Sequence, residues 1–548
     1  MLSHLTSVRS SDEAQQAAAR YFRKLLSRPS PFVNAVGSLL QHEALVPALI
    51  NGLAKQHLPE MQLDCAWALT NLACGSRSET HVLTTQEAPR ALVRVAQDRA
   101  SSFELRDQAI WALSNIAGDC AQCKTQVVNL GYVPLVVDMF TQLADHMQFG
   151  QNDTDLDSNV ERHLASLKTI VWALSNVCRG RTMIAFPELA PALPVLATLL
   201  RHRAQFCAEL TADVVWTLAY IGNGTVAQVQ AVLDENISAE LIACMEHTNA
   251  RVMSGALRAV GNLITGNDSQ TQRLLDAGVL AVLCKLINST NMEIRRETMW
   301  TLSNITAGTA EQIDTILLEP HLMQNIIDLL CHDELKVRKE ASWVLCNACS
   351  GGSATQRRTL LLDWDALAVI KHVLSTQLRT PSQLVVPIIM IAFAALNALS
   401  DAIGTPPLAY SVLSAYAFDE LLQQYMNFEN ALVEIENVDM VRLEATQLWT
   451  KYHEERTLAG QATEITNATL LLKIVLYTGS KVHRHEQYDH KTWRWRQPPR
   501  TPMPMTFVRA APLPLSLALF CIAQLRSSMS ECCWCYTGPR NVATLCDG

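Results

Sequence analysis

One eleven-residue motif recurs along the chain, and it constrains the fold more than any other feature of the sequence. Seven copies and a weaker eighth span residues 65–75, 109–119, 170–180, 214–224, 256–266, 298–308, 341–351 and 394–404. The pattern is Trp, three residues, Asn and then a closing Gly, as in CAWALTNLACG at 65–75. Such internal self-similarity indicates a repeat array, in which each unit buries its apolar face against its neighbours.

The spacing of the copies indicates which kind of array this is. The third position of successive copies gives steps of 44, 61, 44, 42, 42 and 43 residues. A period in the low forties belongs to HEAT and armadillo arrays and is longer than tetratricopeptide or ankyrin repeats. The step of 61 contains the polar stretch QFGQNDTDLDSNV at 148–160. We interpret this stretch as an exposed insertion between two units.

Each repeat predicts helices and no strands. The segment VPLVVDMFTQLA at 133–144 carries apolar residues at helical spacing. A second helix carries the Trp motif, and we expect the closing Gly to cap its C-terminus. The prediction is an all-α, right-handed armadillo-repeat superhelical solenoid of about nine to ten repeats over residues 1–455.

Composition and charge exclude several functional classes. The net charge is −8, so a basic ligand fits better than nucleic acid. The N-terminus has no apolar run typical of a signal peptide, and the stretch 513–525 is too short to span a bilayer, so no membrane partner is expected. We therefore read the 16 cysteines as reduced thiols. Neither Cys120 with Cys123 nor the group at 532–535 has the spacing of a zinc site, and we predict no metal and no cofactor.

The repeated Trp and Asn predict a peptide-binding surface. Residues four apart on a helix share one face. An Asn side chain can both donate to and accept from the backbone of an extended peptide, and slots between indoles suit the stems of Lys or Arg. A single repeated Trp is often a core anchor. Burying Asn beside it in every repeat, however, would leave amide groups in need of partners.

The motifs closely resemble those of importin alpha (karyopherin alpha), an armadillo adaptor family that carries nuclear localisation signals. The resemblance runs from about Glu13 to about Glu455. It includes the family's exceptions, because Tyr220 replaces Asn in the fourth repeat and Arg258 replaces Trp in the fifth. It implies a nuclear import adaptor of the cytoplasm and nucleus, whose partners are proteins with Lys/Arg-rich nuclear localisation signals.

The resemblance also implies two peptide-binding sites on the array. Gly75, Thr80 and Asp119 match the family's pocket for a central Lys. The complete major site would be Trp67, Asn71, Gly75, Thr80, Gln108, Trp111, Asn115, Asp119, Trp172, Asn176, Asp213 and Trp216. The minor site would be Arg258, Asn262, Thr265, Asp268, Glu297, Trp300, Asn304, Glu340, Trp343 and Asn347.

Three departures from the family pattern modify these expectations. The first predicted helix, at 12–27, has no basic arm before it. In the family that arm binds importin beta, so we do not expect this chain to bind importin beta by itself. Thr169 stands three residues before Trp172, where the family commonly has Asn. The match ends near Glu455, and we predict that residues 456–548 form a disordered or aberrant tail.

The alternatives to an import adaptor are an enzyme and a different kind of armadillo scaffold. The sequence contains no nucleotide-binding loop, zinc-protease motif or nucleophile elbow, so we predict no catalytic residue and no enzyme. The alternative function is an armadillo scaffold that binds other extended peptides without a role in import. Such a scaffold would keep the helical period but would not need the Trp and Asn positions.

Overall fold

The computed structural model describes residues 1–7, 9–27, 44–147, 158–180, 184–398 and 412–459. Within these ranges the regular structure is helical and no strand occurs. Residues 1–463 form one compact unit. The predicted all-α armadillo solenoid is confirmed. Most of the predicted insertion and nearly all of the predicted tail lie outside the described residues, and helix α11 begins at Ser158.

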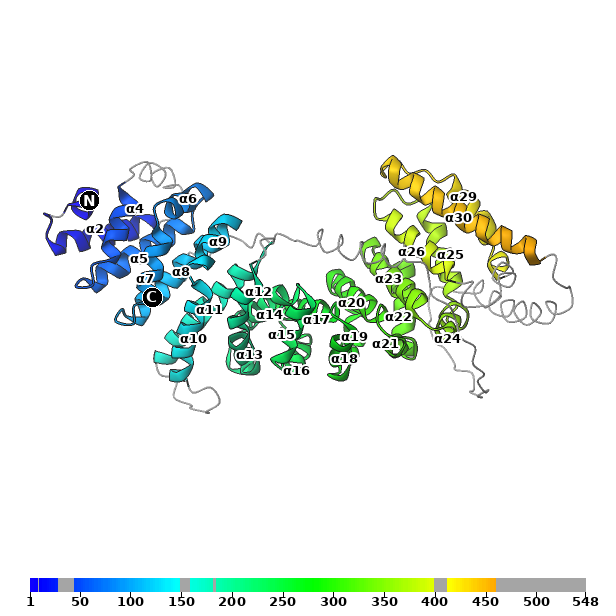
Figure 1. Cartoon of the computed structure of the whole chain (residues 1–548), viewed down its shortest axis with the longest axis horizontal. Coiled ribbons are helices and arrows are strands. Elements are labelled where there is room, and N and C mark those ends of the chain that lie inside the picture. Colours follow the sequence, from blue (N-terminus) through cyan, green and yellow to red (C-terminus); the bar gives the residue numbers. More distant parts are fainter. Residues whose placement is uncertain (8, 28–43, 148–157, 181–183, 399–411, 460–548) are drawn as a thin grey trace. The chain divides into compact units, whose positions relative to one another are not determined.

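One helix of each repeat carries the Trp motif, and these helices form a layer in which each packs against the next in chain order (Figure 1). Small residues allow the close packing, since Ala66 and Ala68 of the first copy are fully buried. The layer comprises α2 (Asp12–Leu26), α5 (Pro59–Ala73), α8 (Phe103–Asp119), α11 (Ser158–Cys178), α14 (Ala208–Gly222), α17 (Ala250–Ile264), α20 (Met292–Thr306), α23 (Leu335–Gly351), α26 (Val385–Asn397) and α30 (Ile435–Ala459).

Two further helices precede the motif helix in most repeats. The first is short, and the set comprises α6 (Arg77–Thr85), α9 (Ala121–Asn129), α12 (Phe186–Leu189), α15 (Val226–Asp234), α18 (Asp268–Asp276), α21 (Ala310–Leu317) and α24 (Ala354–Arg358). The second packs behind the motif layer, and the set comprises α4 (Leu45–Leu53), α7 (Ala88–Gln97), α10 (Tyr132–Met147), α13 (Leu193–Arg201), α16 (Ser238–Cys244), α19 (Val279–Leu286), α22 (Pro320–His332), α25 (Ala366–Gln377) and α29 (Phe418–Met426). Helix α1 (Leu2–Thr6) precedes the array.

Capping boxes begin several of the short helices and also connect neighbouring repeats. In α18 the side chain of Asn267 accepts from the backbone of Gln270, and Gln270 accepts from the backbone N–H of Asn267. The same Gln270 amide donates to the carbonyl of Val226, the first residue of α15, over 3.0 Å. Gln312 repeats this contact with the carbonyl of Asp268 over 2.8 Å. The Gln side chain of the capping box therefore helps to set the register between repeats.

The closing Gly of the motif has a different role from the one expected. Neither Gly75 nor Gly308 adopts the left-handed conformation of a capping glycine. A Cβ atom at Gly75 would instead collide with the carboxylate of Glu79, and one at Gly308 would collide with the amide of Gln312. The glycine leaves the space into which the capping-box side chain closes. The prediction of a glycine helix cap is therefore wrong at these positions, whereas Gly180 does have a positive φ of 100°.

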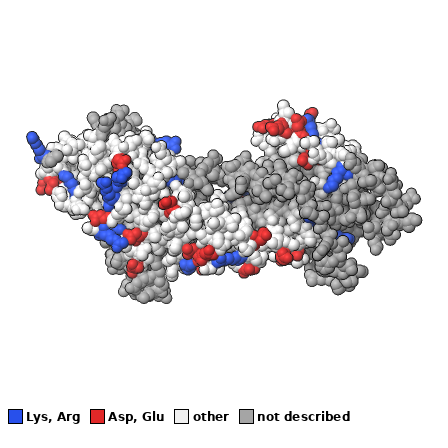
Figure 2. Space-filling view, in the orientation of Figure 1, with Lys and Arg blue, Asp and Glu red and all other residues white. Residues whose placement is uncertain are grey.

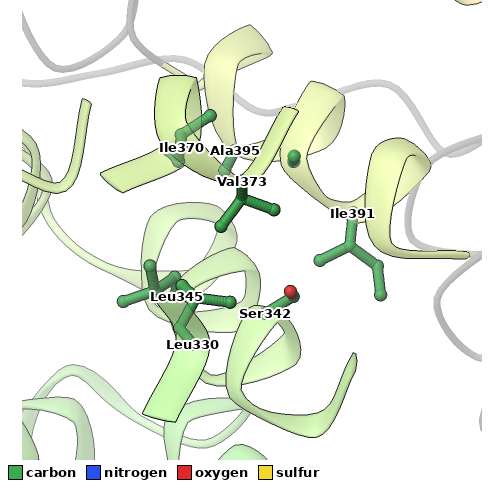
Figure 3. A pocket seen from close by; sticks show the side chains of 8 residues that line it. Leu330, Ser342, Leu345, Ile370, Val373, Ile391 and Ala395 are labelled. Carbon is green, nitrogen blue, oxygen red and sulfur yellow. The ribbon is translucent and has the colours of Figure 1, made fainter. Parts of the chain in front are cut away.

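A small crevice between α22, α23, α25 and α26 illustrates the packing inside the array (Figure 3). Its lining is apolar except for Ser342, whose hydroxyl already donates to the carbonyl of Arg338 over 2.8 Å. A ligand site normally offers several convergent polar groups. We therefore interpret the crevice as imperfect packing between two repeats.

The apolar helices of the described ranges are short for membrane spans. No single helix in the described ranges is both long and apolar enough to cross a bilayer. The helices at 121–129 and 132–145 pass the same test only when taken together, and they are bent by 62° at their junction.

Candidate peptide-binding surface

The ladder Trp residues, at the third position of each motif, are half-buried or exposed on the motif layer. Trp111 has the most accessible indole of the set, with 39% of its surface exposed. Trp216 lies against the next repeat, where its indole N–H donates to the carbonyl of Arg251 over 3.1 Å. Trp300 packs on the backbone of Gly261, where any Cβ would clash with the indole. The indoles are therefore held by neighbouring helices but keep surface for a ligand.

The ladder Asn residues, four positions after each Trp or after Arg258, are tied to the preceding repeat by their amide nitrogens, with Asn304 as the exception. The Nδ2 atom of Asn115 lies 3.4 Å from the carbonyl oxygen of Thr70, which directly precedes Asn71. The same contact recurs from Asn176 to Ser114 (3.4 Å), from Asn262 to Ala219 (2.8 Å) and from Asn347 to Ser303 (2.8 Å). Each of these carbonyls belongs to the residue before the equivalent ladder position.

These contacts bear on the expectation that Asn side chains buried beside the Trp residues would lack hydrogen-bond partners. The expectation that buried Asn would lack partners within the fold is wrong for these four residues, because each neighbouring repeat supplies a carbonyl. In Asn304 the Nδ2 atom is buried and has no hydrogen-bond partner among the residues that the structure describes. Among the described residues no hydrogen bond reaches the Oδ1 atom of Asn71, Asn115 or Asn176. The ladder thus has fixed side chains that can still accept a hydrogen bond.

The residues predicted to form the lysine pocket lie at the junction of α5, α6 and α8. Gly75 and Thr80 flank the start of α6, where the buried Thr80 hydroxyl lies 3.5 Å from the carbonyl of Ala73. Asp119 is the last residue of α8, and its buried Oδ2 atom accepts no hydrogen bond from the described part of the chain. The guanidinium of the exposed Arg77 lies 3.8 Å from this oxygen. This carboxylate has one loose, solvent-exposed partner, and the 18% of its side chain that is exposed is the part a ligand cation can reach.

Three residues before each ladder Trp stands a second set of polar residues. Gln108 is buried and donates to the hydroxyl of Thr70 over 2.7 Å. Asp213 pairs with Arg251 over 3.0 Å, and burial raises the pKa of Asp213. Thr169, which departs from the family pattern, lies 3.5 Å from the carboxylate of Asp107.

Sequence analysis missed one member of this set, Asp64. Its carboxylate pairs with Arg23 over 3.0 Å and with Arg20 over 3.5 Å, and burial raises the pKa of Asp64. The signal was present, because Asp64 stands at the same distance before Trp67 as Asp213 does before Trp216.

An arginine begins each run of ladder Trp residues. The guanidinium of Arg258 lies 5.2 Å from the ring centre of Trp300 and 2.6 Å from the carboxylate of Glu297. Arg23 repeats this geometry, at 5.1 Å from the ring centre of Trp67, with Asp64 as its carboxylate partner.

Arg23 therefore occupies an additional ladder position. It stands 44 residues before Trp67, which is one repeat step. Ser27 correspondingly stands 44 residues before Asn71 and accepts from its amide over 2.9 Å.

Asp107 is a further acidic residue on the ladder face. It precedes Trp111 by four residues, so Asp107, Trp111 and Asn115 form one stripe along α8. Its Oδ1 atom is shielded from solvent and accepts no hydrogen bond. Burial raises the pKa of Asp107 to about 7, although Ser166 and Thr169 partly oppose this by hydrogen bonding.

The residues assigned to the minor site are only partly brought together. Glu340 is buried, which raises its pKa, and its nearest basic partner is Lys339 at 3.8 Å. Thr265 donates to the carbonyl of Asn262 over 2.7 Å and so adjoins the ladder. The exposed side chain of Asp268 makes no hydrogen bond to a ladder residue in the described part of the chain. Figure 2 shows acidic and basic side chains interspersed over one face of the array.

One cluster has side-chain atoms of the kind that bind metals. Donor atoms of Asp119, Cys120 and Cys123 lie within 4.8 Å of one another. Three donors are one fewer than the four of a structural zinc site. The two sulfurs already contact each other at 2.7 Å. The cluster therefore does not change the prediction that the chain needs no metal.

Comparisons with known proteins show what the chain is similar to. Residues 267–307, which cover α18 to α20, match the family model described as "Armadillo/beta-catenin-like repeat". Importin subunit alpha-1b of Oryza sativa subsp. japonica is 34% identical over 265 residues, which cover 48% of this chain and 44% of that protein. Importin subunit alpha-1a of the same plant is 34% identical over 257 residues, 46% of this chain and 44% of that protein. The chain is importin-alpha-like.

Two further comparisons define how far this similarity extends. Probable importin subunit alpha-A of Dictyostelium discoideum is 30% identical over 265 residues, which cover 48% of this chain and 46% of that protein. Each match therefore spans less than half of the curated relative's length. The crystal structure of an engineered protein covers 82% of this chain and 98% of its own, with a TM-score of 0.64 at 24% identity. This last similarity supports the fold alone.

Proposed function

We propose that this importin-alpha-like armadillo protein is a nuclear import adaptor. In this proposal it binds Lys/Arg-rich nuclear localisation signals, in an extended conformation, along the Trp/Asn ladder. Cargo proteins with such signals are its partners, and it acts in the cytoplasm and nucleus. The proposal rests on the ladder geometry together with the importin alpha relatives.

The observation that carries the proposal is the fixed set of Asn side chains. Asn115 and Asn176 are oriented by contacts from their nitrogens to the preceding repeat, and no described residue donates to their oxygens. An extended peptide presents backbone N–H groups at regular intervals, and such an oxygen can accept from them without reading the side chains. Because the amides are already held, little side-chain entropy is lost when the peptide binds.

The preference for basic side chains is supported by the chain's own arginines. Arg23 and Arg258 each place a guanidinium over a ladder Trp and beside a carboxylate. A peptide Lys or Arg can use the same combination of ring face and negative charge at Trp111, whose indole is exposed and lies on the helix that ends in Asp119. We propose Asp119 as the charge partner of the central Lys of the ligand.

A second function is an armadillo scaffold for other extended peptides. It is favoured by the ion pairs that already occupy Asp64, Asp213 and Glu297, because these carboxylates are partly neutralised within the chain. A scaffold of this kind would bind peptide backbones through the Asn ladder with little preference for Lys or Arg.

Titration with matched peptides separates the two functions. One labelled peptide has five consecutive Lys/Arg residues, and in its partner all five are Ala. We expect a dissociation constant on the order of 1 μM or tighter for the basic peptide, with quenching or a spectral shift of the ladder Trp fluorescence. The Ala peptide should bind at least about tenfold more weakly, which corresponds to 1.4 kcal/mol. Equal binding of both peptides would favour the scaffold, and no binding of either would refute both functions.

A further inference from the structure

Two cysteines at the start of α9 have their sulfur atoms in direct contact. Cys120 is the N-cap residue of α9, and its sulfur accepts from the backbone N–H of Cys123 over 3.2 Å. The sulfur of Cys123, three residues later, lies 2.7 Å from that of Cys120. A disulfide bond is about 2.05 Å long, so these side chains already point at each other at little more than bonding distance.

The two thiols differ in access, which assigns them different roles. Cys120 is partly exposed, whereas only 2% of the Cys123 surface is exposed. Burial is the largest cause that raises the pKa of Cys123, to about 12, so its thiol keeps its proton until a partner is in contact. The backbone N–H of Cys123 can stabilise negative charge that develops on the Cys120 sulfur. Cys120 is therefore suited to attack an external disulfide first, and Cys123 to resolve the product.

We propose that Cys120 and Cys123 form a redox-active dithiol that exchanges with low-molecular-weight disulfides such as glutathione disulfide. In the first step the Cys120 sulfur attacks one sulfur of glutathione disulfide, forms a mixed disulfide and releases one glutathione, which takes the proton from Cys120. In the second step the Cys123 sulfur attacks the Cys120 sulfur, and the second glutathione leaves with the proton from Cys123. The products are one intrachain disulfide and two glutathione molecules.

The position of the pair makes this exchange relevant to the array. Cys120 follows Asp119 directly, so the disulfide would form at the border of the proposed lysine pocket. The proposal does not depend on peptide binding, because it concerns the thiols alone.

A matched internal control is provided by Cys207. It is also exposed and is the N-cap residue of a helix, α14, but Leu210 stands three residues later where α9 has Cys123. A mixed disulfide formed at Cys207 has no neighbouring thiol at that position to resolve it. The two caps therefore compare a paired thiol with an unpaired one on the same chain.

The test uses the full chain, reduced and then incubated with glutathione disulfide. Samples are quenched in acid, alkylated and mapped by mass spectrometry, so that each adduct is assigned to its residue. We expect an intrachain Cys120–Cys123 disulfide in the unchanged chain and a persistent glutathione adduct at Cys207. In Cys123→Ser the adduct should remain on Cys120, and in Cys120→Ser the buried Cys123 should stay unmodified.

Two results would overturn the proposal. One is a glutathione adduct that persists on Cys120 in the unchanged chain to the same extent as on Cys207. The other is a Cys123→Ser variant that has a native circular dichroism spectrum and yet forms no adduct on Cys120. Circular dichroism of all variants shows whether a negative result reflects unfolding.

Discussion

The two ladders of Trp residues share a design but differ in how their acidic groups are paired. Each begins with an arginine, Arg23 or Arg258, that lies over the first Trp and pairs with a carboxylate. Asp64 and Glu297, which stand at equivalent positions, are each paired with two arginines. In the first ladder Asp119 has only the exposed Arg77 near it in the described part of the chain, at 3.8 Å.

A second difference lies four residues before the Trp positions. This place holds Asp107 before Trp111, but Arg296 before Trp300 and Lys339 before Trp343. In the first ladder this place holds Lys168 before Trp172 as well, so Asp107 is the acidic exception among basic and apolar residues. Because both ladders have similar helices and Asn contacts, charge pairing within the chain is the feature that should make them unequal. We expect a short basic peptide to prefer the first ladder.

The largest effect should come from reversing the charge of Asp119. Asp119→Lys removes the proposed partner of the central Lys and places a like charge beside it. The affinity for the five-residue basic peptide should fall by about 2–5 kcal/mol, as when one member of a desolvated ion pair is lost. Isothermal titration calorimetry measures this directly.

Neutralising a paired carboxylate in the second ladder adds to the comparison, although its position is not equivalent to that of Asp119. Glu297→Gln removes a carboxylate that is already paired with two arginines of the chain. The affinity for the short peptide should therefore change by less than about twofold, or 0.4 kcal/mol. If Glu297→Gln weakens binding as much as Asp119→Lys, the two ladders are equivalent and our assignment of the preferred site is wrong.

The sequence predicted the layer and the ladder because both depend on periodicity within a repeat. A Trp and an Asn four apart must share a helix face wherever the helix lies. The step of 44 residues before Trp67 also leads to Arg23, but Arg is neither of the two residue types that define the ladder motif.

Contacts between repeats could not be predicted in the same way. The donation from Asn262 to the carbonyl of Ala219 depends on how two helices from different repeats are placed side by side. The closure of Glu79 over Gly75 depends on a side-chain conformation in the capping box. The ion pair between Asp213 and Arg251 likewise depends on the packing of α14 against α17. Motif spacing shows which residues share a face, but it does not show which of them are already paired.

The next effect in size should be the pH dependence that Asp107 confers on the first ladder. Its folded pKa of about 7 exceeds the value near 3.9 of an unfolded Asp. Between these values the native chain holds a proton that the unfolded chain releases, so stability falls as the pH rises through this window and levels off above it. Asp107→Asn removes this titration. It should raise stability by on the order of 1–3 kcal/mol at pH 8 and by less at pH 5.

Thermal unfolding of both proteins at the two pH values measures this effect. The gap between the melting temperatures of Asp107→Asn and the unchanged chain should widen from pH 5 to pH 8. Lys168→Gln, which changes an exposed lysine at the equivalent place before Trp172, is the control and should leave the gap unchanged. A constant gap would show that Asp107 does not titrate as its burial suggests.

A smaller effect should distinguish the Asn residues of the array from one another. Asn262→Ala removes a hydrogen bond of 2.8 Å to a buried carbonyl and should cost about 1–2 kcal/mol of stability. Asn304 is equally buried, but its amide nitrogen has no partner, so Asn304→Ala should cost less. Chemical denaturation of the two variants gives the comparison. Equal losses would mean that the contact to the preceding repeat contributes little.

The smallest effect should come from Arg77, the loose partner of Asp119. Its guanidinium is 3.8 Å from the carboxylate and its side chain is 77% exposed, so this ion pair contributes little to stability. A peptide Lys that binds Asp119 must compete with Arg77 and approach its positive charge. Arg77→Ala should therefore tighten binding of the basic peptide by about 0.2–1 kcal/mol at low salt, and the gain should shrink as the salt concentration rises. Arg90→Ala, which removes an exposed arginine paired with Glu87, is the control for net charge. If Arg77→Ala weakens binding, Arg77 contacts the ligand and does not compete with it, and Asp119 is then not the free carboxylate that separates the first ladder from the second.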